Sequence, residues 1–78
     1  MAVTDYWGWG SVEGVSSYQG KGWVYLDING DVSWYTTNPS YGPDQVVTIA
    51  TQALVSTTQT HAYVRIQTGQ IIGIDYWG

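Results

Sequence analysis

The sequence predicts a mainly β domain with one helix, folded as a five-stranded barrel. Three observations lead to this prediction. Apolar and polar residues alternate in two separate stretches, and between them lies a segment whose apolar residues recur about every 3.6 positions. Turn-forming dipeptides separate these segments. The chain has 78 residues, enough for one domain spanning residues 1–78 but not for two.

The first strand is expected near residues 10–17. Val12 and Val15 favour extended structure, while Gly10 and Gly14 indicate a bend or a β-bulge. After this strand, Gly20 and Gly22 predict a turn, because glycine readily adopts a positive φ.

A hairpin centred on Asn29-Gly30 is the clearest signal in the chain. A two-residue loop would pair Ile28 with Asp31 and Leu26 with Ser33, mixing apolar and polar side chains. A three-residue loop separates them, so we expect that register. One face then carries Val24, Leu26, Val32 and Trp34, and the other carries Trp23, Tyr25, Asp27, Asp31, Ser33 and Tyr35.

Residues 36–43 are expected to form a loop, and a helix is predicted from Asp44 to Ser56. Its apolar residues follow the spacing of an amphipathic helix, and Pro43 suits a first helical position. The consecutive β-branched residues around Val47 weaken the helix locally.

The last third returns to an alternating pattern and predicts a second hairpin with a three-residue loop at Thr68-Gly69. Arg65 and Asp75 are expected to form a surface ion pair on one face. The other face carries Val64, Ile66, Ile72, Ile74 and Tyr76.

Three strands, a helix and two strands, in that order, form an OB-fold-like barrel. One repeat supports closure, since Asp5-Tyr6-Trp7-Gly8 recurs as Asp75-Tyr76-Trp77-Gly78. The two copies are expected to pack alike, either at the barrel seam or across a subunit boundary. Chance recurrence in a chain rich in Tyr, Trp and Gly is the alternative.

Residues 50–66 resemble the helix-to-strand joint of AB5 toxin B subunits, most closely the subtilase-cytotoxin and pertussis-like branch. The matching elements are Ala53-Leu54, Thr57-Thr58 and Val64-Arg65-Ile66, and the ending 69–74 resembles the closing strand of such proteins. The resemblance implies an OB-fold that assembles into a ring, commonly a pentamer, and binds glycans. The chain lacks the glycine expected in the turn at 58–60 and the usual disulfide, and no sugar-binding residue of that family can be carried over.

Composition narrows the possible partners. The net charge is −4, with two basic residues, which argues against nucleic acid and anionic membranes as partners. The chain has no cysteine, and so small a domain without disulfides is expected to gain stability by oligomerisation. No apolar stretch is long enough to span a membrane, and no signal peptide is recognised. We therefore expect a secreted or periplasmic location only if a leader has been removed.

The best candidate ligand site is the polar-aromatic face of the central hairpin. Its expected ligand-binding residues are Trp23, Tyr25, Asp27 and Tyr35. Aromatic rings beside carboxylates suit sugars, whose C–H faces stack on rings while their hydroxyls form hydrogen bonds. The same rings could instead lie in a subunit contact or in the core.

A homo-oligomer interface is expected on the uncharged side of the helix and at the repeated ends of the chain. The expected contact residues are Val47, Thr51, Val55, Trp7 and Trp77. A solvated helix normally carries charged side chains there. A helix covered by its own barrel is the alternative.

Neither a metal or cofactor site nor an active site is predicted. Asp27 to Asp31 resembles part of a calcium loop, but its spacing suits a hairpin turn better. His61, the only histidine, is expected to be a surface residue rather than a catalytic base. Asp27 and Asp31 could resemble the carboxylate pair of a glycosidase, but the domain leaves little room for a cleft. We therefore expect a ring-forming, glycan-binding protein rather than an enzyme, with a structural or inhibitory module that binds a partner protein as the alternative.

Overall fold

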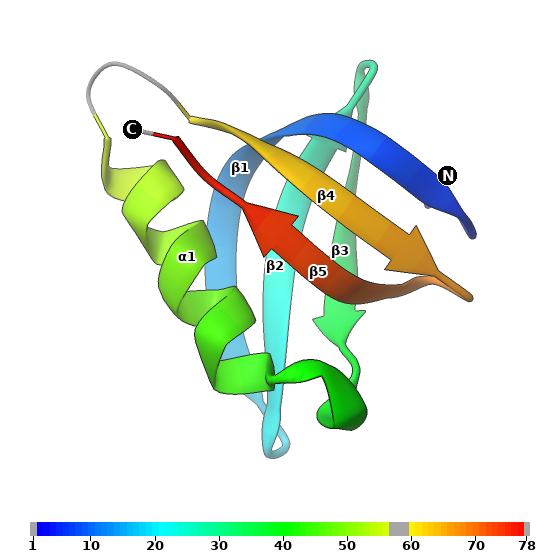
Figure 1. The fold of residues 1–78 in the computed structure, drawn as a ribbon, viewed down its shortest axis with the longest axis vertical. Helices are drawn as coiled ribbons and strands as arrows, with labels where there is room; N and C mark the ends of the chain where they lie inside the picture. Colours follow the sequence, from blue (N-terminus) through cyan, green and yellow to red (C-terminus); the bar gives the residue numbers. More distant parts are fainter. Residues whose placement is uncertain (1, 57–59, 78) are drawn as a thin grey trace.

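The structure, a computed structural model, describes residues 2–56 and 60–77 and confirms a mainly β barrel with one helix (Figure 1). The elements in chain order are β1 (Tyr6–Tyr18), β2 (Lys21–Ile28), β3 (Asp31–Thr37), the short 3-10 helix η1 (Pro39–Tyr41), α1 (Pro43–Val55), β4 (His61–Gln67) and β5 (Gln70–Asp75). The helix matches its predicted range to within one residue at each end. Thr57-Thr58 of the resemblance and Gly78 of the repeat lie outside the described residues.

The five strands close in the order β1-β2-β3-β5-β4. β1 pairs with β4 through residues 6–11 and with β2 through residues 11–18. β3 and β5 close the barrel in parallel, with Thr36 opposite Gln70 and Thr37 opposite Ile71. With α1 between the third and fourth strands, this arrangement confirms the predicted OB-fold-like barrel.

β1 bends because it carries one extra residue. The β1–β2 register shifts between Val12 and Gly14, so Glu13 is left without a partner opposite it. A bulge of this kind increases the local twist and lets one long strand join two parts of a barrel. The predicted bulge is confirmed, although the strand is longer than expected and begins at Tyr6.

The predicted register of the central hairpin is wrong. Asn29 and Gly30 both have positive φ, at 54° and 89°, which is the geometry of a two-residue turn. Ile28 is therefore paired with Asp31, and Val24 with Tyr35. The one-residue shift in register exchanges the inner and outer faces of β3, so that Tyr35 is buried while Val32 and Trp34 are exposed.

Two hydrogen bonds explain why the observed register is stable although it places apolar and polar side chains on the same face of the hairpin. The Val3 N–H donates to the Tyr35 hydroxyl at 3.0 Å, so the polar tip of this buried ring is hydrogen-bonded. Asp31 and Ser33 lie near the turn, where they are only half-buried, and the Ser33 hydroxyl donates to Asp31 at 3.3 Å. Polar residues can therefore share the inner side of β3, because their hydrogen bonds are satisfied.

The β4–β5 hairpin also has a two-residue turn instead of the expected three-residue loop, with φ values of 54° and 74° at Thr68 and Gly69. Its register shifts beyond Ile71, so Ile71 is fully buried and Ile72, predicted to face the core, is half-buried. The bulge restores the expected pairing near the end of the strand. The predicted Arg65–Asp75 ion pair is confirmed, at 2.9 Å.

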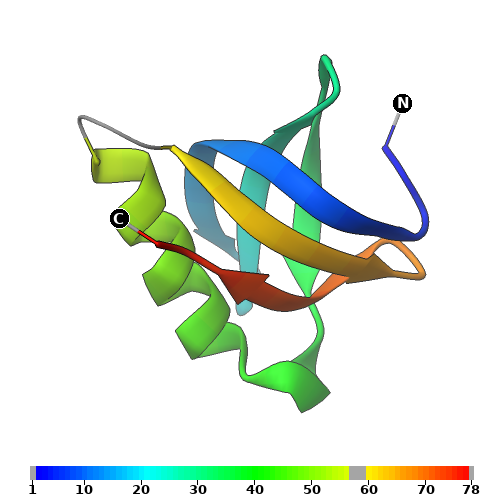
Figure 2. The ribbon, with the colours of Figure 1, turned by 45° about the horizontal axis from the view of Figure 1, so that its top comes forward.

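The core lies between the barrel wall and α1, which packs against β1, β2, β4 and β5 (Figure 1, Figure 2). Its buried residues are Val12, Val24, Leu26, Ile28, Tyr35, Val46, Ala50, Ala53, Ala62, Val64, Ile66, Ile71 and Ile74. The helix begins after Gly42, whose carbonyl accepts the Val46 N–H at 3.1 Å. Burial of one face against the barrel stabilises α1 despite its β-branched residues.

The inward position of Tyr35 leads to a first prediction. We expect Tyr35→Phe to lower the free energy of unfolding by about 1 kcal/mol, because the Val3 N–H loses its acceptor while the ring still fills the core. Urea denaturation followed by circular dichroism measures the change. Tyr18→Phe, at an exposed tyrosine, is the control and should change the value by less than about 0.5 kcal/mol. Equal effects of the two substitutions would contradict the burial of the Tyr35 hydroxyl.

Candidate functional site

Exposed aromatic side chains gather on the outside of β1 and β4 and beside the end of β5. The exposed ones are Trp7 and Trp9 of β1 and Trp77 just after β5, and together with the half-buried Tyr63 and Arg65 of β4 they form what we call the aromatic surface. In the β1–β4 register Trp7 lies opposite Arg65 and Trp9 lies opposite Tyr63. Strand alternation therefore places these side chains on one face.

The rings contact one another. Trp9 meets Tyr63 edge to face, with ring centroids 5.6 Å apart and planes at 88°. Trp9 also meets Trp77, again at 5.6 Å, with the planes tilted by 55°. Trp7 and Trp77 nevertheless remain 63% exposed and Trp9 49% exposed. The surface thus presents flat apolar area to the surroundings, supported from below by the sheet.

Arg65 links the aromatic surface. Its guanidinium lies 5.7 Å from the Trp7 ring centroid and 5.2 Å from that of Tyr63, within the range of cation–π attraction. Asp75 holds the same group through the 2.9 Å ion pair. Both side chains of the pair are over a third exposed, so solvent screening leaves the pair little effect on stability. Its effect is to fix the guanidinium between two rings.

Tyr6 and Gly8 support the backbone beneath Trp9. The Tyr6 hydroxyl donates to the Trp9 carbonyl at 2.8 Å. Its ring fills the space above Gly8, where a Cβ would lie only 2.6 Å from the hydroxyl oxygen. Glycine at position 8 therefore lets the tyrosine fold over the strand and hold the segment that carries both tryptophans.

A polar hollow of about 360 Å³ borders the aromatic surface at Trp9. Its other lining residues are Gly10, Ser11, Asp27, Asn29, Gly30 and His61. The Gly30 N–H donates to Asp27 Oδ1 at 2.8 Å, which fixes the carboxylate in the wall of the hollow. His61, exposed as predicted, begins β4 and lines the same hollow.

The predicted ligand-binding residues are only partly brought together. Trp23, Tyr25 and Asp27 alternate along the outer side of β2, as expected, and Asp27 reaches the polar hollow. Tyr35, 1% exposed, lies in the core on the opposite side of the hairpin. The expected pairing of Tyr35 with Trp23 is therefore wrong, and Trp34 lies on the outer face instead, opposite Tyr25, with ring centroids 4.7 Å apart.

The indole N–H of Trp23 is unusual among the polar groups of the hairpin. The residue is half-buried, and its indole Nε1 is buried with no hydrogen-bond partner among the described residues. This orphan donor lies on the β2–β3 face rather than on the aromatic surface. Asp31 is on the same side of β3 as Tyr35, so it does not form a carboxylate pair with Asp27 on one face.

The predicted interface residues are found in two places. Thr51 and Val55 are exposed on α1, and Val55 is 71% exposed. Val47 is half-buried against Gly22, whose missing Cβ would lie 2.6 Å from its methyl group. Trp7 and Trp77 are part of the aromatic surface. The described residues of the two repeat copies therefore lie on opposite sides of β4, one copy in β1 and the other at the end of β5.

The five tryptophans of the chain are all outside the buried core. Four of them are exposed, and Trp23 is half-buried, while the core consists of aliphatic residues and Tyr35. Tryptophan normally contributes strongly to cores and interfaces because of its large apolar area. A chain that leaves so much of this area in solvent presents a surface suited to a ligand or partner.

Comparison with protein-family models, with curated proteins and with solved structures finds no significant match. In the part of the chain that the structure describes, no helix has the length and apolar character needed to cross a membrane.

The support of Trp9 by Tyr6 leads to a second prediction. We expect Gly8→Ala to destabilise the protein by about 1–3 kcal/mol, because the new methyl group must displace the Tyr6 ring and its hydrogen bond. Gly14→Ala on the same strand is the control, since its Cβ would meet Tyr25 at an ordinary 3.5 Å. Thermal unfolding of the two variants measures the difference. A Gly8→Ala protein as stable as the Gly14→Ala protein would contradict the role of Tyr6.

Proposed function

We propose that this protein binds glycans through the aromatic surface and the adjoining polar hollow. The observation that carries the proposal is the meeting of exposed rings and polar groups at Trp9, which belongs to both. The C–H faces of sugar rings stack on aromatic side chains. Their hydroxyls need donors and acceptors close by, which Asp27, Asn29 and His61 supply in the hollow.

The electrostatics favour a neutral glycan. Arg65 is the basic residue of the aromatic surface, and Asp75 already pairs with it. The whole chain carries a net charge of −4, which repels anionic ligands over distances of about a Debye length, ~8–10 Å in physiological salt. A chain of uncharged sugars would meet no such repulsion.

The proposal includes assembly into a ring, as in the AB5 toxin B subunits that the C-terminal third resembles. The exposed Val55 and Thr51 on α1 support a contact between copies through this helix. Assembly would place several aromatic surfaces on one particle, and avidity can then exceed the affinity of one site by about 10²–10⁴. Weak single sites would be sufficient for binding to a glycan-coated surface.

A partner protein is the alternative ligand of the same surface. Tryptophan, tyrosine and arginine dominate the binding energy of protein interfaces, and the aromatic surface contains all three. The polar hollow beside Trp9 favours the glycan, because such a recess places hydrogen-bonding groups where sugar hydroxyls would lie. A glycan array separates the two, since the protein-binding alternative expects no sugar to be retained.

The binding proposal leads to a third prediction. We expect Trp77→Ala to weaken glycan binding about tenfold, the effect of losing roughly 1.4 kcal/mol of stacking. Trp77 follows the last strand and is 63% exposed, so the substitution should leave the fold intact. A neutral oligosaccharide selected on the array is titrated while tryptophan fluorescence is followed.

Tyr41→Ala is the matched control, because Tyr41 is 51% exposed in η1, outside the aromatic surface. Its Kd should equal that of the wild type. An unchanged Kd for Trp77→Ala would count against the aromatic surface, and failure of every glycan on the array would sink the proposed function.

The assembly proposal leads to a fourth prediction. We expect Val55→Glu to shift the protein from a ring toward monomers, because a carboxylate in a tight contact loses its hydration. Sedimentation velocity at micromolar concentration gives the two distributions. Gln67→Glu, at an exposed position of β4, adds the same charge away from α1 and should leave the assembly unchanged. A monomeric wild-type protein would refute the ring.

A further inference from the structure

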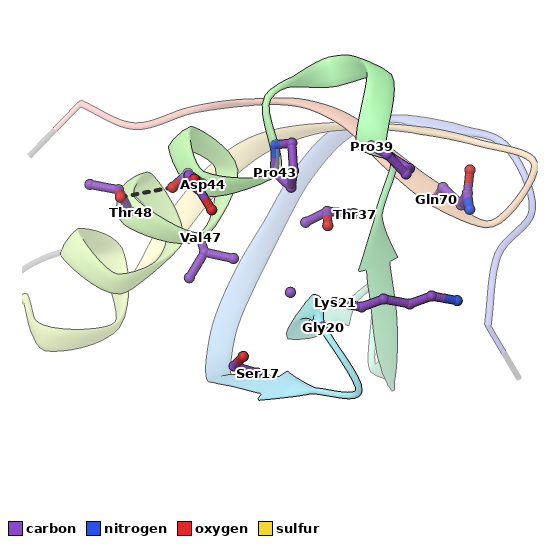
Figure 3. A pocket seen from close by; sticks show the side chains of 11 residues that line it. Ser17, Gly20, Lys21, Thr37, Pro39, Pro43, Asp44, Val47, Thr48 and Gln70 are labelled. Atoms are coloured by element: carbon purple, nitrogen blue, oxygen red, sulfur yellow. Dashed lines mark hydrogen bonds between the residues drawn. The ribbon is translucent and has the colours of Figure 1, made fainter.

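A second cavity lies at the other end of β2, away from the polar hollow (Figure 3). Its volume is about 570 Å³, within the usual range of small-molecule sites. The β1–β2 turn, the end of β3, the first turn of α1 and the start of β5 surround it. None of its lining residues belongs to the aromatic surface or to the polar hollow.

The side-chain hydroxyl of Thr37 is the polar group of this cavity that matters most for ligand binding. The residue is 5% exposed, and its hydroxyl is directed into the space between the surrounding elements (Figure 3). No described residue forms a hydrogen bond to this hydroxyl, while the Thr37 carbonyl accepts from Thr36 at 3.4 Å. Among the described residues the Trp23 Nε1 is the one buried side-chain polar atom without a partner, so the Thr37 hydroxyl is accessible from the cavity and can form a hydrogen bond to a ligand hydroxyl there.

The other polar groups lie on different walls of the cavity. Lys21, the single lysine of the chain, comes from β2, and Asp44 comes from the first turn of α1 (Figure 3). The Asn38 Nδ2 donates to Oε1 of Gln70 in β5 at 2.8 Å, so the NH2 group of Gln70 is the part of this side chain that can donate to a ligand. The lining thus holds donors, acceptors and charges of both signs.

Gly22 allows α1 to pack closely on β2 beside the cavity. A Cβ at this position would lie 2.6 Å from the Val47 side chain and 3.5 Å from the Thr37 hydroxyl oxygen. Val47 therefore packs directly on the β2 backbone beside Thr37. The buried end of the cavity is built from close packing between α1, β2 and β3.

We propose that this cavity binds one neutral sugar unit and is a second carbohydrate site. The ligand class rests on the proposed function, but the residues are independent of it. Asp44 disfavours a phosphate or carboxylate, and the opposite charge of Lys21 leaves the lining neutral overall. A sugar ring carries hydroxyls around its whole edge, which suits polar groups on opposing walls, whereas Pro39 and Pro43 offer apolar contact to its C–H groups.

Nuclear magnetic resonance tests the inference. The ¹⁵N-labelled protein is titrated separately with glucose, galactose and N-acetylglucosamine, each to about 50 mM, a range that detects millimolar Kd values. We expect one of them to shift the amide signals of Lys21, Thr37 and Gln70. Thr37→Val should weaken this binding about tenfold, whereas Trp77→Ala should leave it unchanged.

Stability provides the second readout. Thr37→Val keeps the shape of the side chain and removes a hydroxyl that no described residue binds, so its melting temperature should equal or exceed that of the wild type. A lowered melting temperature would show that the hydroxyl has a structural partner and would overturn the inference. Thr4→Val, at an exposed position before β1 and outside the cavity, is the matched control for binding and should not change the Kd.

A rim variant keeps the test decisive if Thr37→Val fails to fold. Ser17→Phe, at an exposed position of β1, should block the cavity and abolish the shifts. Absence of shifts at Lys21, Thr37 and Gln70 with all three sugars overturns the second site. The proposed function would survive that result if the oligosaccharide still bound with a Trp77-dependent Kd, so the two failures are distinguishable.

Discussion

Closure of the barrel by β1 is the constraint on which the rest of the structure depends. This one strand pairs with β4 through its first half and with β2 through its second half, and the bulge at Glu13 provides the bend between them. Without that bend, β4 and β2 would remain edge strands with unpaired backbone groups. Closure also decides what the outer surface displays. The segment paired with β4 carries tryptophan at alternate positions, so the same pairing that completes the barrel places Trp7 and Trp9 beside Tyr63 and Arg65.

The element order and the helix could be predicted because they depend on local periodicity. The hairpin registers could not, because a two-residue and a three-residue turn differ only in backbone angles at positions such as Asn29 and Gly30. A three-residue turn keeps apolar and polar side chains on separate faces, and the observed two-residue turn mixes them. Tyr35 shows why the mixed face is stable: its hydroxyl accepts the Val3 N–H, which lies 32 residues away in the sequence. Such long-range hydrogen bonds leave no local pattern, and one residue of slip exchanges the two faces of a strand.

The candidate site was only partly visible in the sequence for the same reason. Trp23, Tyr25 and Asp27 share an outer face whichever turn is assumed, because they alternate on one strand. The aromatic surface depends instead on which strands become neighbours, and that is set by β1–β4 pairing. The repeated Asp-Tyr-Trp-Gly segment was its one sequence signal. Both copies flank β4, and Trp77 reaches the ring of Trp9 because the two segments run in the same direction on either side of that strand.

The distribution of large side chains supports the proposed binding role, because it does not serve the stability of the domain. A domain of 78 residues has few ways to gain stability, and a buried tryptophan would contribute more apolar area than any aliphatic residue. Yet the core is built from valine, isoleucine, leucine and alanine with a single tyrosine, and the tryptophans are on the outside. Exposed rings contribute little to folding, since they are half-solvated in the native state as well. In addition, the Tyr6 ring packs over Gly8 and its hydroxyl stabilises the backbone that carries Trp9. The fold therefore packs aliphatic residues inside the barrel and leaves its largest apolar side chains on the outside, where the proposed ligand would contact them.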